Sequence, residues 1–168
     1  MRELLSQRCS RTDAQLILQQ LRHKKSLVAF SNYLFDNDNK VNRNAAWILT
    51  QATDNELLQL LPLYDKLADL VLQTPNTALK RLTLNILQRM PVTPELLRTD
   101  FLNFCLEHMT MPRETAGVQA LCMKIAHQLC QFHPDLQHEF RCIVESMEAC
   151  YYTPAVNCVR QKILKKGV

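Results

Sequence analysis

Glycine is nearly absent from this chain, and long hydrophobic runs are missing as well. Gly117 and Gly167 are the only glycines among 168 residues, whereas glycine normally makes up about 7% of a protein. Glycine-rich phosphate loops and tight hairpins need this residue, so the sequence argues against nucleotide cradles and β-sheet folds. No segment approaches the roughly 18 apolar residues of a membrane span. The first residues, MRELLSQRCSRTD, contain no apolar stretch typical of a signal peptide, and we expect no membrane partner.

Charge and cysteine content narrow the class of protein further. The net charge of +4 permits an acidic partner, whereas nucleic-acid-binding domains more often have a pI above about 9 with clustered basic residues. Seven cysteines form an odd set without framework spacing, which favours reduced thiols and a cytoplasmic location. The length fits one domain over residues 1–168. Residues 1–11 precede the first predicted helix and are the candidate for a poorly ordered segment.

Five prolines recur at a spacing close to 40 residues, which is the period of helix-pair repeats. Pro75, Pro112 and Pro154 are spaced 37 and 42 apart, and Pro94 and Pro134 are 40 apart. Proline is tolerated in the first turn of a helix, because the amide there has no intrahelical partner. The sequence predicts helices over residues 12–22, 25–35, 39–53, 55–72, 75–90, 94–109, 113–131, 134–149 and 154–166.

Superposing one helix of each pair reveals a repeated pattern. Offsets of 37, 39 and 38 residues align two columns that are apolar in every repeat. They are Ala45, Leu82, Leu121 and Val159, and Leu49, Ile86, Ile125 and Ile163. Each helix therefore has a broad apolar arc and a narrow polar stripe, which indicates burial between neighbours in a stack of about four helix pairs.

The repeated helices resemble a known family. The residues Val41, Arg43, Ala45, Ala46 and Leu49 look like the second-helix signature of HEAT repeats, and residues 82–87 and 159–164 are degenerate versions of it. Over residues 39–166 the chain is similar to small bacterial proteins of the HEAT/armadillo superfamily. The resemblance implies an all-α, right-handed α-α superhelix and a binding role without a reaction or a cofactor.

Two cysteines and two histidines have a spacing close to that of a zinc knuckle. Cys130, His133, His138 and Cys142 offer ligands that suit zinc. The pattern lacks the glycine of a knuckle, and core cysteines with loop or surface histidines explain it more simply. We therefore predict no metal site, with this set as the alternative.

The sequence contains no signature of catalysis. The cysteines recur at helical core positions, no nucleophile elbow is present, and we predict a protein that is not an enzyme. One alternative is a DNA-binding or base-excision protein of the alkylation-repair type, a glycosylase-like member of the same superfamily, in which Trp47 would stack on bases. Trp47 aligns with Leu84 and Met123, which favours a packing residue at the edge of the apolar arc.

The polar stripes of the repeated helices are the candidate binding surface. In HEAT-type stacks these helices line one concave face, so their stripes are predicted to form a ridge with no acidic residue. Its residues are Asn44, Gln51, Arg81, Asn85, Gln88, Lys124, His127, Lys162 and Lys165. This composition favours an interaction module or scaffold that binds an acidic protein or peptide. An ordinary solvated face is the alternative interpretation.

Overall fold

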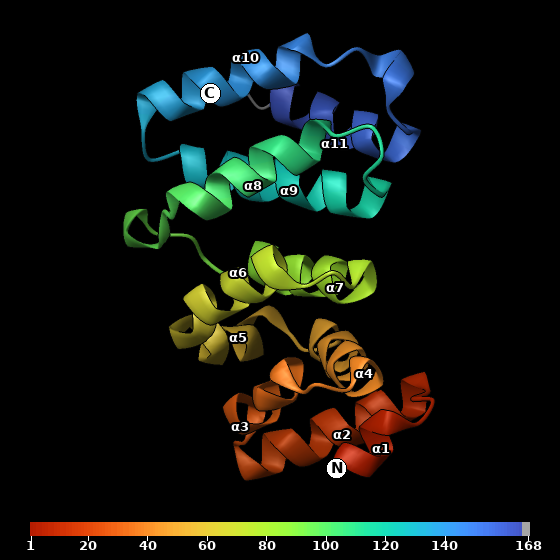
Figure 1. Ribbon diagram of the computed structural model, residues 1–168. Coiled ribbons are helices and arrows are strands. Elements are labelled where there is room, and N and C mark those ends of the chain that lie inside the picture. The colour runs from red at the N-terminus through yellow and green to blue at the C-terminus, as the bar shows by residue number, and fades with distance from the viewer. Residues whose placement is uncertain (166–168) are drawn as a thin grey trace. The chain divides into compact units, whose positions relative to one another are not determined.

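The computed structural model describes residues 1–165 of the chain. These residues form helices joined by short loops, and they contain no strand (Figure 1). The chain divides into two compact units, Met1–Pro91 and Val92–Val168. The all-helical class predicted from the sequence is confirmed.

The first unit is organised around two helices, α4 and α7, that pack directly against each other. Helices α1, α2 and α3 and the 3₁₀ helix η1 cover α4, while α6 covers α7 (Figure 1). The elements are α1 (Arg2–Ser6), α2 (Arg11–Lys24), α3 (Leu27–Ser31), η1 (Asn32–Phe35), α4 (Asn39–Thr50), α5 (Asp54–Leu57), η2 (Leu58–Leu63), α6 (Tyr64–Gln73) and α7 (Thr77–Gln88).

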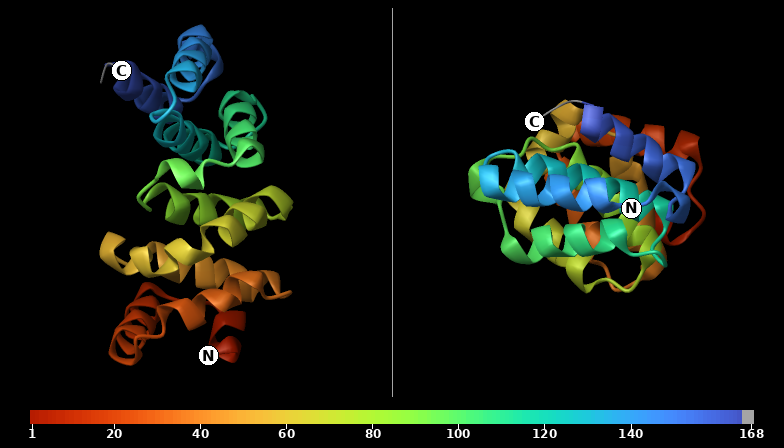
Figure 2. Two further views of the ribbon diagram at one scale, coloured as in Figure 1. Left: turned by 90° about the vertical axis from the view of Figure 1, so that its left-hand side faces the viewer. Right: turned by 90° about the horizontal axis from the view of Figure 1, so that it is seen from above.

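The second unit is organised around α9, which contacts α8, α10 and α11 (Figure 2). Its elements are η3 (Pro94–Leu96), α8 (Thr99–Thr110), α9 (Ala116–Cys130), α10 (Pro134–Ser146), η4 (Ala149–Tyr151) and α11 (Pro154–Lys165). Helices α4, α7, α9 and α11 are the later members of the predicted helix pairs, and we call them the second helices.

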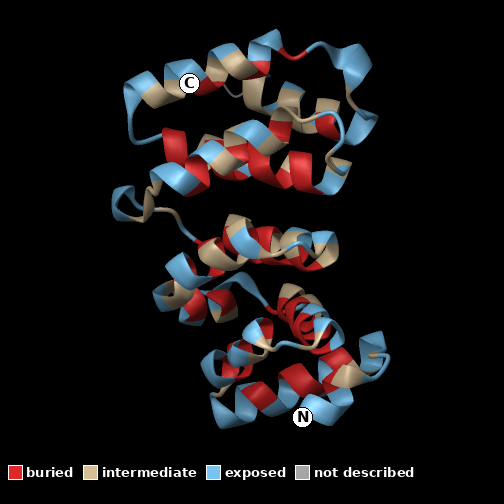
Figure 3. Cartoon of the chain, viewed as in Figure 1, coloured by how far each residue is buried: buried red, intermediate tan, exposed pale blue. Residues whose placement is uncertain are grey.

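Three of the second helices are buried around most of their circumference (Figure 3). Leu49, Ile86 and Ile125 are at most 1% exposed, as the column alignment predicts. Helix α11 differs, because Val156 is the one buried residue among its described positions. Gln161 is exposed in α11, whereas the aligned Met123 is fully buried in α9. Helix α11 therefore has the solvated face that a terminal repeat requires.

Three predicted helices are interrupted in the structure. Residues 55–72 form α5, η2 and α6 instead of one helix. Pro62 lies inside η2, and it has no amide hydrogen for an α-helical bond. Residues 94–109 contain the short helix η3 and then extended backbone at Leu97 and Arg98 before α8 begins. Predicted residues 25–35 are likewise split between α3 and η1.

Three of the five spaced prolines begin a helix, and two precede one. Pro94, Pro134 and Pro154 are the first residues of η3, α10 and α11. Helix α7 begins after Asn76, whose side chain accepts hydrogen bonds from the amides of residues 78 and 79. Pro112 lies in a turn before α9. Asn76 accepts hydrogen bonds from two backbone amides in the first turn of α7 that have no partner within the helix. The proline ring has no acceptor atom that could do this.

The N-terminal segment packs against the first unit. Leu5 of α1 is fully buried, and Arg2 forms a two-bond ion pair with Asp36 in the loop before α4. Ser10 and Asp13 form a capping box that begins α2. Residues 1–11 therefore contain a helix that covers α4, where the sequence suggested poor order.

Truncating a buried column residue should destabilise the protein strongly. We expect Ile86→Ala to lower the free energy of unfolding by about 2–5 kcal/mol, because it removes buried methyl groups and leaves a cavity. Leu16→Ala is a suitable control, since Leu16 is 54% exposed and exposed positions usually contribute less than about 0.5 kcal/mol. Urea denaturation of both variants measures the difference, and equal midpoints would contradict the assigned core.

Glu56 makes part of the stability dependent on acidic pH. The hydrogen bond from Arg22 on α2, with further bonds from Thr53, lowers the pKa of this carboxyl from 4.5 to about 2. A lowered pKa contributes stability above pH 4.5 that is lost as the pH falls toward 2. We expect Glu56→Gln to unfold with a smaller change in urea midpoint between pH 5 and 2 than the parent chain. Glu107→Gln, at an exposed position on α8, is the control, and identical pH profiles for Glu56→Gln and the parent would contradict the assignment.

Candidate functional site

Acidic residues are absent from the second helices. No Asp or Glu occurs within α4, α7, α9 or α11, whose residues the structure describes completely. The cations on these helices are Lys40, Arg43, Lys80, Arg81, Lys124, Arg160, Lys162 and Lys165. Helices α6, α8 and α10, which pack against them, carry acidic residues, and α6 and α10 also carry Lys66 and Arg141. Negative charge is therefore excluded from the second helices, which the net charge of the whole chain does not reveal.

In the first unit, most of the predicted ridge residues reach the surface. Gln51 at the end of α4 and Arg81 of α7 are exposed, while Asn85 and Gln88 are partly exposed. Asn44 is 8% exposed, and its side-chain amide donates to the backbone oxygens of Leu5 and Gln7 at 2.8 Å each. Asn44 therefore anchors the N-terminal segment. The prediction that it faces solvent on the ridge is wrong, because α1 covers this position of α4.

In the second unit, the lysines of α9 and α11 are exposed. They are Lys124, Lys162 and Lys165. His127 is partly buried, with its ring centroid 5.7 Å from that of Phe140 on α10. Three of the ridge residues predicted in this unit are therefore exposed cations, whereas His127, predicted for the same ridge, lies partly buried against Phe140.

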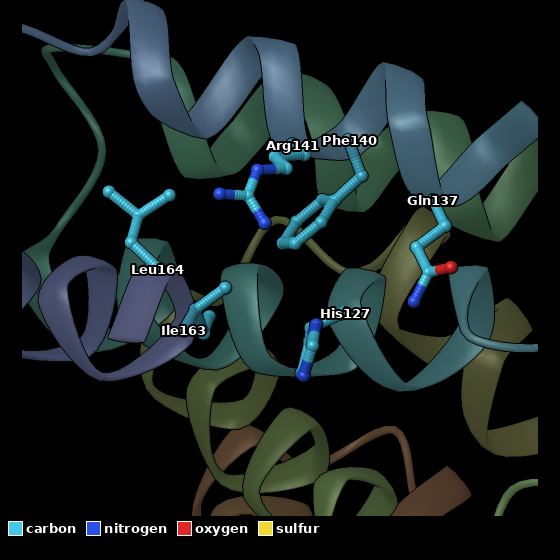
Figure 4. Close-up of a pocket in the computed structure, with 6 residues that line it drawn as sticks. All are labelled: His127, Gln137, Phe140, Arg141, Ile163 and Leu164. Atoms are coloured by element: carbon cyan, nitrogen blue, oxygen red, sulfur yellow. The ribbon is translucent and has the colours of Figure 1, made fainter. Parts of the chain in front are cut away.

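A small hollow lies beside His127, between α9, α10 and α11 (Figure 4). Its lining residues are His127, Gln137, Phe140, Arg141, Ile163 and Leu164. Its volume of about 10 Å³ is close to the minimum that one water molecule needs. Arg141 is also paired with Glu145 on its own helix. This hollow has no room for a small-molecule ligand.

Arginine side chains cap two of the helices. Arg89, just after α7, donates to the backbone oxygens of Thr50 and Ala52 at the end of α4 and also pairs with Asp54. Arg160 of α11 donates to the oxygens of Val144 and Glu145 near the end of α10. A cation near a helix C-terminus satisfies carbonyls that lack intrahelical partners. The sequence analysis missed both roles, which depend on residues up to 39 positions away.

The structure does not bring the four candidate zinc ligands together. Cys130 is 1% exposed at the end of α9, and burial raises the pKa of its thiol to about 11. His133 is the exposed residue before α10, while His138 and Cys142 lie one turn apart on α10 with Nε2 and Sγ 3.7 Å apart. Among the residues that the structure describes, no three His, Cys, Asp or Glu side chains could hold a metal ion.

Trp47 is partly exposed on α4, whereas the aligned Leu84 and Met123 are fully buried. It follows Arg43 by four residues, so the two side chains lie on one face of the helix. Its position at the edge of the apolar arc agrees with the expected packing role, and the residue keeps some exposure to solvent.

The cysteines differ in accessibility, and this difference is testable. Exposed Cys142, Cys150 and Cys158 should react with Ellman's reagent in the folded protein, because their sulfur atoms are accessible. The buried thiols are Cys105, Cys122 and Cys130. Burial is the main cause that raises the pKa of Cys105, and these thiols should react after unfolding in denaturant. Fast reaction of the buried set in native buffer, followed by absorbance, would contradict the described core.

Comparison with known proteins identifies the family. No helix in the described part of the chain combines the length and apolar character needed to cross a membrane. Neither curated proteins nor solved structures produced a match to the chain. The model of the HEAT repeat domain family matches residues 1–167, in agreement with the paired helices and the buried columns. The chain belongs to the HEAT repeat domain family.

Proposed function

We propose that this protein is a non-enzymatic interaction scaffold that binds an acidic protein or peptide segment through its second helices. The observation that carries the proposal is the absence of acidic residues from α4, α7, α9 and α11. HEAT repeats are suited to such a role, because stacked helix pairs create extended binding surfaces. The free cysteines are compatible with work in the reducing cytoplasm.

The exposed cations define where such a segment would bind in each unit. In the first unit, Arg81 lies on α7 with Asn85 one turn further. In the second unit, Lys124, Lys162 and Lys165 lie on two helices that pack together. Amide side chains between the cations offer hydrogen bonds to a peptide backbone. Complementary charge steers an acidic partner and sets the specificity of binding more than its strength.

Reversing one cation in each unit tests the proposal. We expect Arg81→Glu combined with Lys124→Glu to abolish capture of protein partners by the tagged chain from its native cell extract. The thermal midpoint should stay within a few degrees, since exposed charges contribute little to stability. Arg11→Glu combined with Lys24→Glu, at exposed positions of α2, makes the same change in charge outside the second helices and should retain capture. Equal capture by both double variants would refute the proposal.

A gel shift distinguishes the DNA-binding alternative. The same cations on a DNA-binding protein would neutralise phosphates, so affinity for duplex would fall steeply between two salt concentrations. Under the scaffold proposal, we expect no specific shift of alkylated duplex compared with undamaged duplex. Tight, damage-specific binding would favour the base-excision alternative and contradict the scaffold proposal.

A further inference from the structure

A basic hollow lies in the first unit, where the N-terminal segment crosses α4. It is lined by Ser6 at the end of α1, by Gln7, Arg8 and Cys9 from the loop between α1 and α2, and by Lys40, Arg43 and Asn44 from α4. Its volume is about 290 Å³, far larger than the hollow beside His127. No acidic residue lines it. None of these residues except Asn44 belongs to the predicted ridge.

The three cations of the hollow have no carboxylate partner. No ion pair of Arg8, Lys40 or Arg43 exists among the described residues, whereas Arg2 and Arg22 of the same unit each pair with a carboxylate. Three positive charges that share one hollow repel one another, and an anionic ligand would relieve that repulsion.

The carboxylates nearest in sequence are engaged elsewhere. Asp36 accepts both bonds from Arg2. Asp38 accepts from the backbone amide of Lys40 at 2.8 Å as the N-cap of α4. Asp13 accepts from Ser10 in the capping box. These acids hold the local backbone, so the hollow keeps its positive charge in the folded protein.

The hollow is formed before any ligand arrives. The two hydrogen bonds from Asn44 fix the backbone of residues 5 and 7 above α4, and the capping box fixes residue 10 at the start of α2. Arg8 is therefore held between two anchored points of the chain. Preorganised groups bind with a lower entropic cost than groups on a mobile segment.

Trp47 adds an apolar contact next to the cations. It is partly exposed and lies one helical turn beyond Arg43 on the same face of α4. Tryptophan and arginine are both enriched in the hot spots of protein interfaces. The structure thus places an apolar surface directly after a cluster of positive charges.

We propose that this hollow binds an acidic segment of a partner protein, with carboxylates on Arg8, Lys40 and Arg43 and an apolar side chain on Trp47. The inference rests on the partner class of the proposed function and assigns it to the first half of α4 and the loop beside it, apart from Arg81 and the lysines of the second unit. A nucleic-acid backbone fits less well, because the pI of the chain is about 8.7, whereas nucleic-acid-binding domains more often have a pI above about 9. Arginine side chains also bind carboxylates in bidentate geometry.

The single tryptophan provides a direct test. The intact chain is titrated with an eight-residue peptide of glutamates and leucines, and Trp47 emission is recorded; a matched peptide has glutamine in place of glutamate. We expect a saturable emission change with the glutamate peptide and none with the glutamine peptide. The apparent affinity should decrease at least tenfold in Lys40→Glu combined with Arg43→Glu. Arg11→Glu combined with Lys24→Glu should bind as the parent does.

The outcomes separate this inference from the proposed function. The variant Arg81→Glu with Lys124→Glu should bind the glutamate peptide normally, since neither substitution lies in the hollow. If the glutamate peptide does not bind saturably, or if Lys40→Glu combined with Arg43→Glu binds it as tightly as the parent chain does, the hollow is not the binding site. Neither result would contradict partner capture that depends on Arg81 and Lys124. Tighter binding of a 12-nucleotide single strand than of the glutamate peptide would overturn the assignment to an acidic protein segment.

Discussion

The burial of the second helices on more than one side is the constraint on which this structure depends. A helix with a broad apolar arc is not stable in water by itself, because one partner cannot cover the arc. Helix α4 is covered by α1, α2, α3, η1 and α7, and α9 is covered by α8, α10 and α11. Helices α4, α7 and α9 consequently have a narrow strip left for solvent, whereas α11 is largely exposed.

The acidic residues lie outside the second helices, so the cations of those helices have no carboxylate on the same helix. The helices that carry the acids use them otherwise: Glu56 completes a capping box and binds Arg22, and Asp54 binds Arg89. These two acids thus stabilise helix ends, while the cations Arg43 and Arg81 are exposed.

Arg81 and Asn44 show why the sequence predicted some residues of the candidate site correctly and others wrongly. The stripe residues Arg81 and Lys124 were located correctly at exposed positions, because helical periodicity determines which side of a helix faces the core. Asn44 has the same periodicity but is buried under residues 5–7. Nothing local to residue 44 signals that contact, since its partners are 37 and 39 residues away. The basic hollow escaped the sequence analysis for the same reason, because Arg8 and Arg43 meet across the fold.

The sequence by itself determined the helical class, the four repeated pairs and the buried columns, because these depend on composition and on periodicities within one helix. It also determined the family, to which residues 1–167 match. The tertiary structure decided where helices are interrupted, as at Pro62, and which polar residues become internal. It also decided that α1 covers α4. Asn44, at one end of the expected ridge, therefore holds the N-terminal segment in place, and the basic hollow forms beside it. Such features depend on contacts between residues that are far apart in the sequence, and local sequence patterns do not predict those contacts.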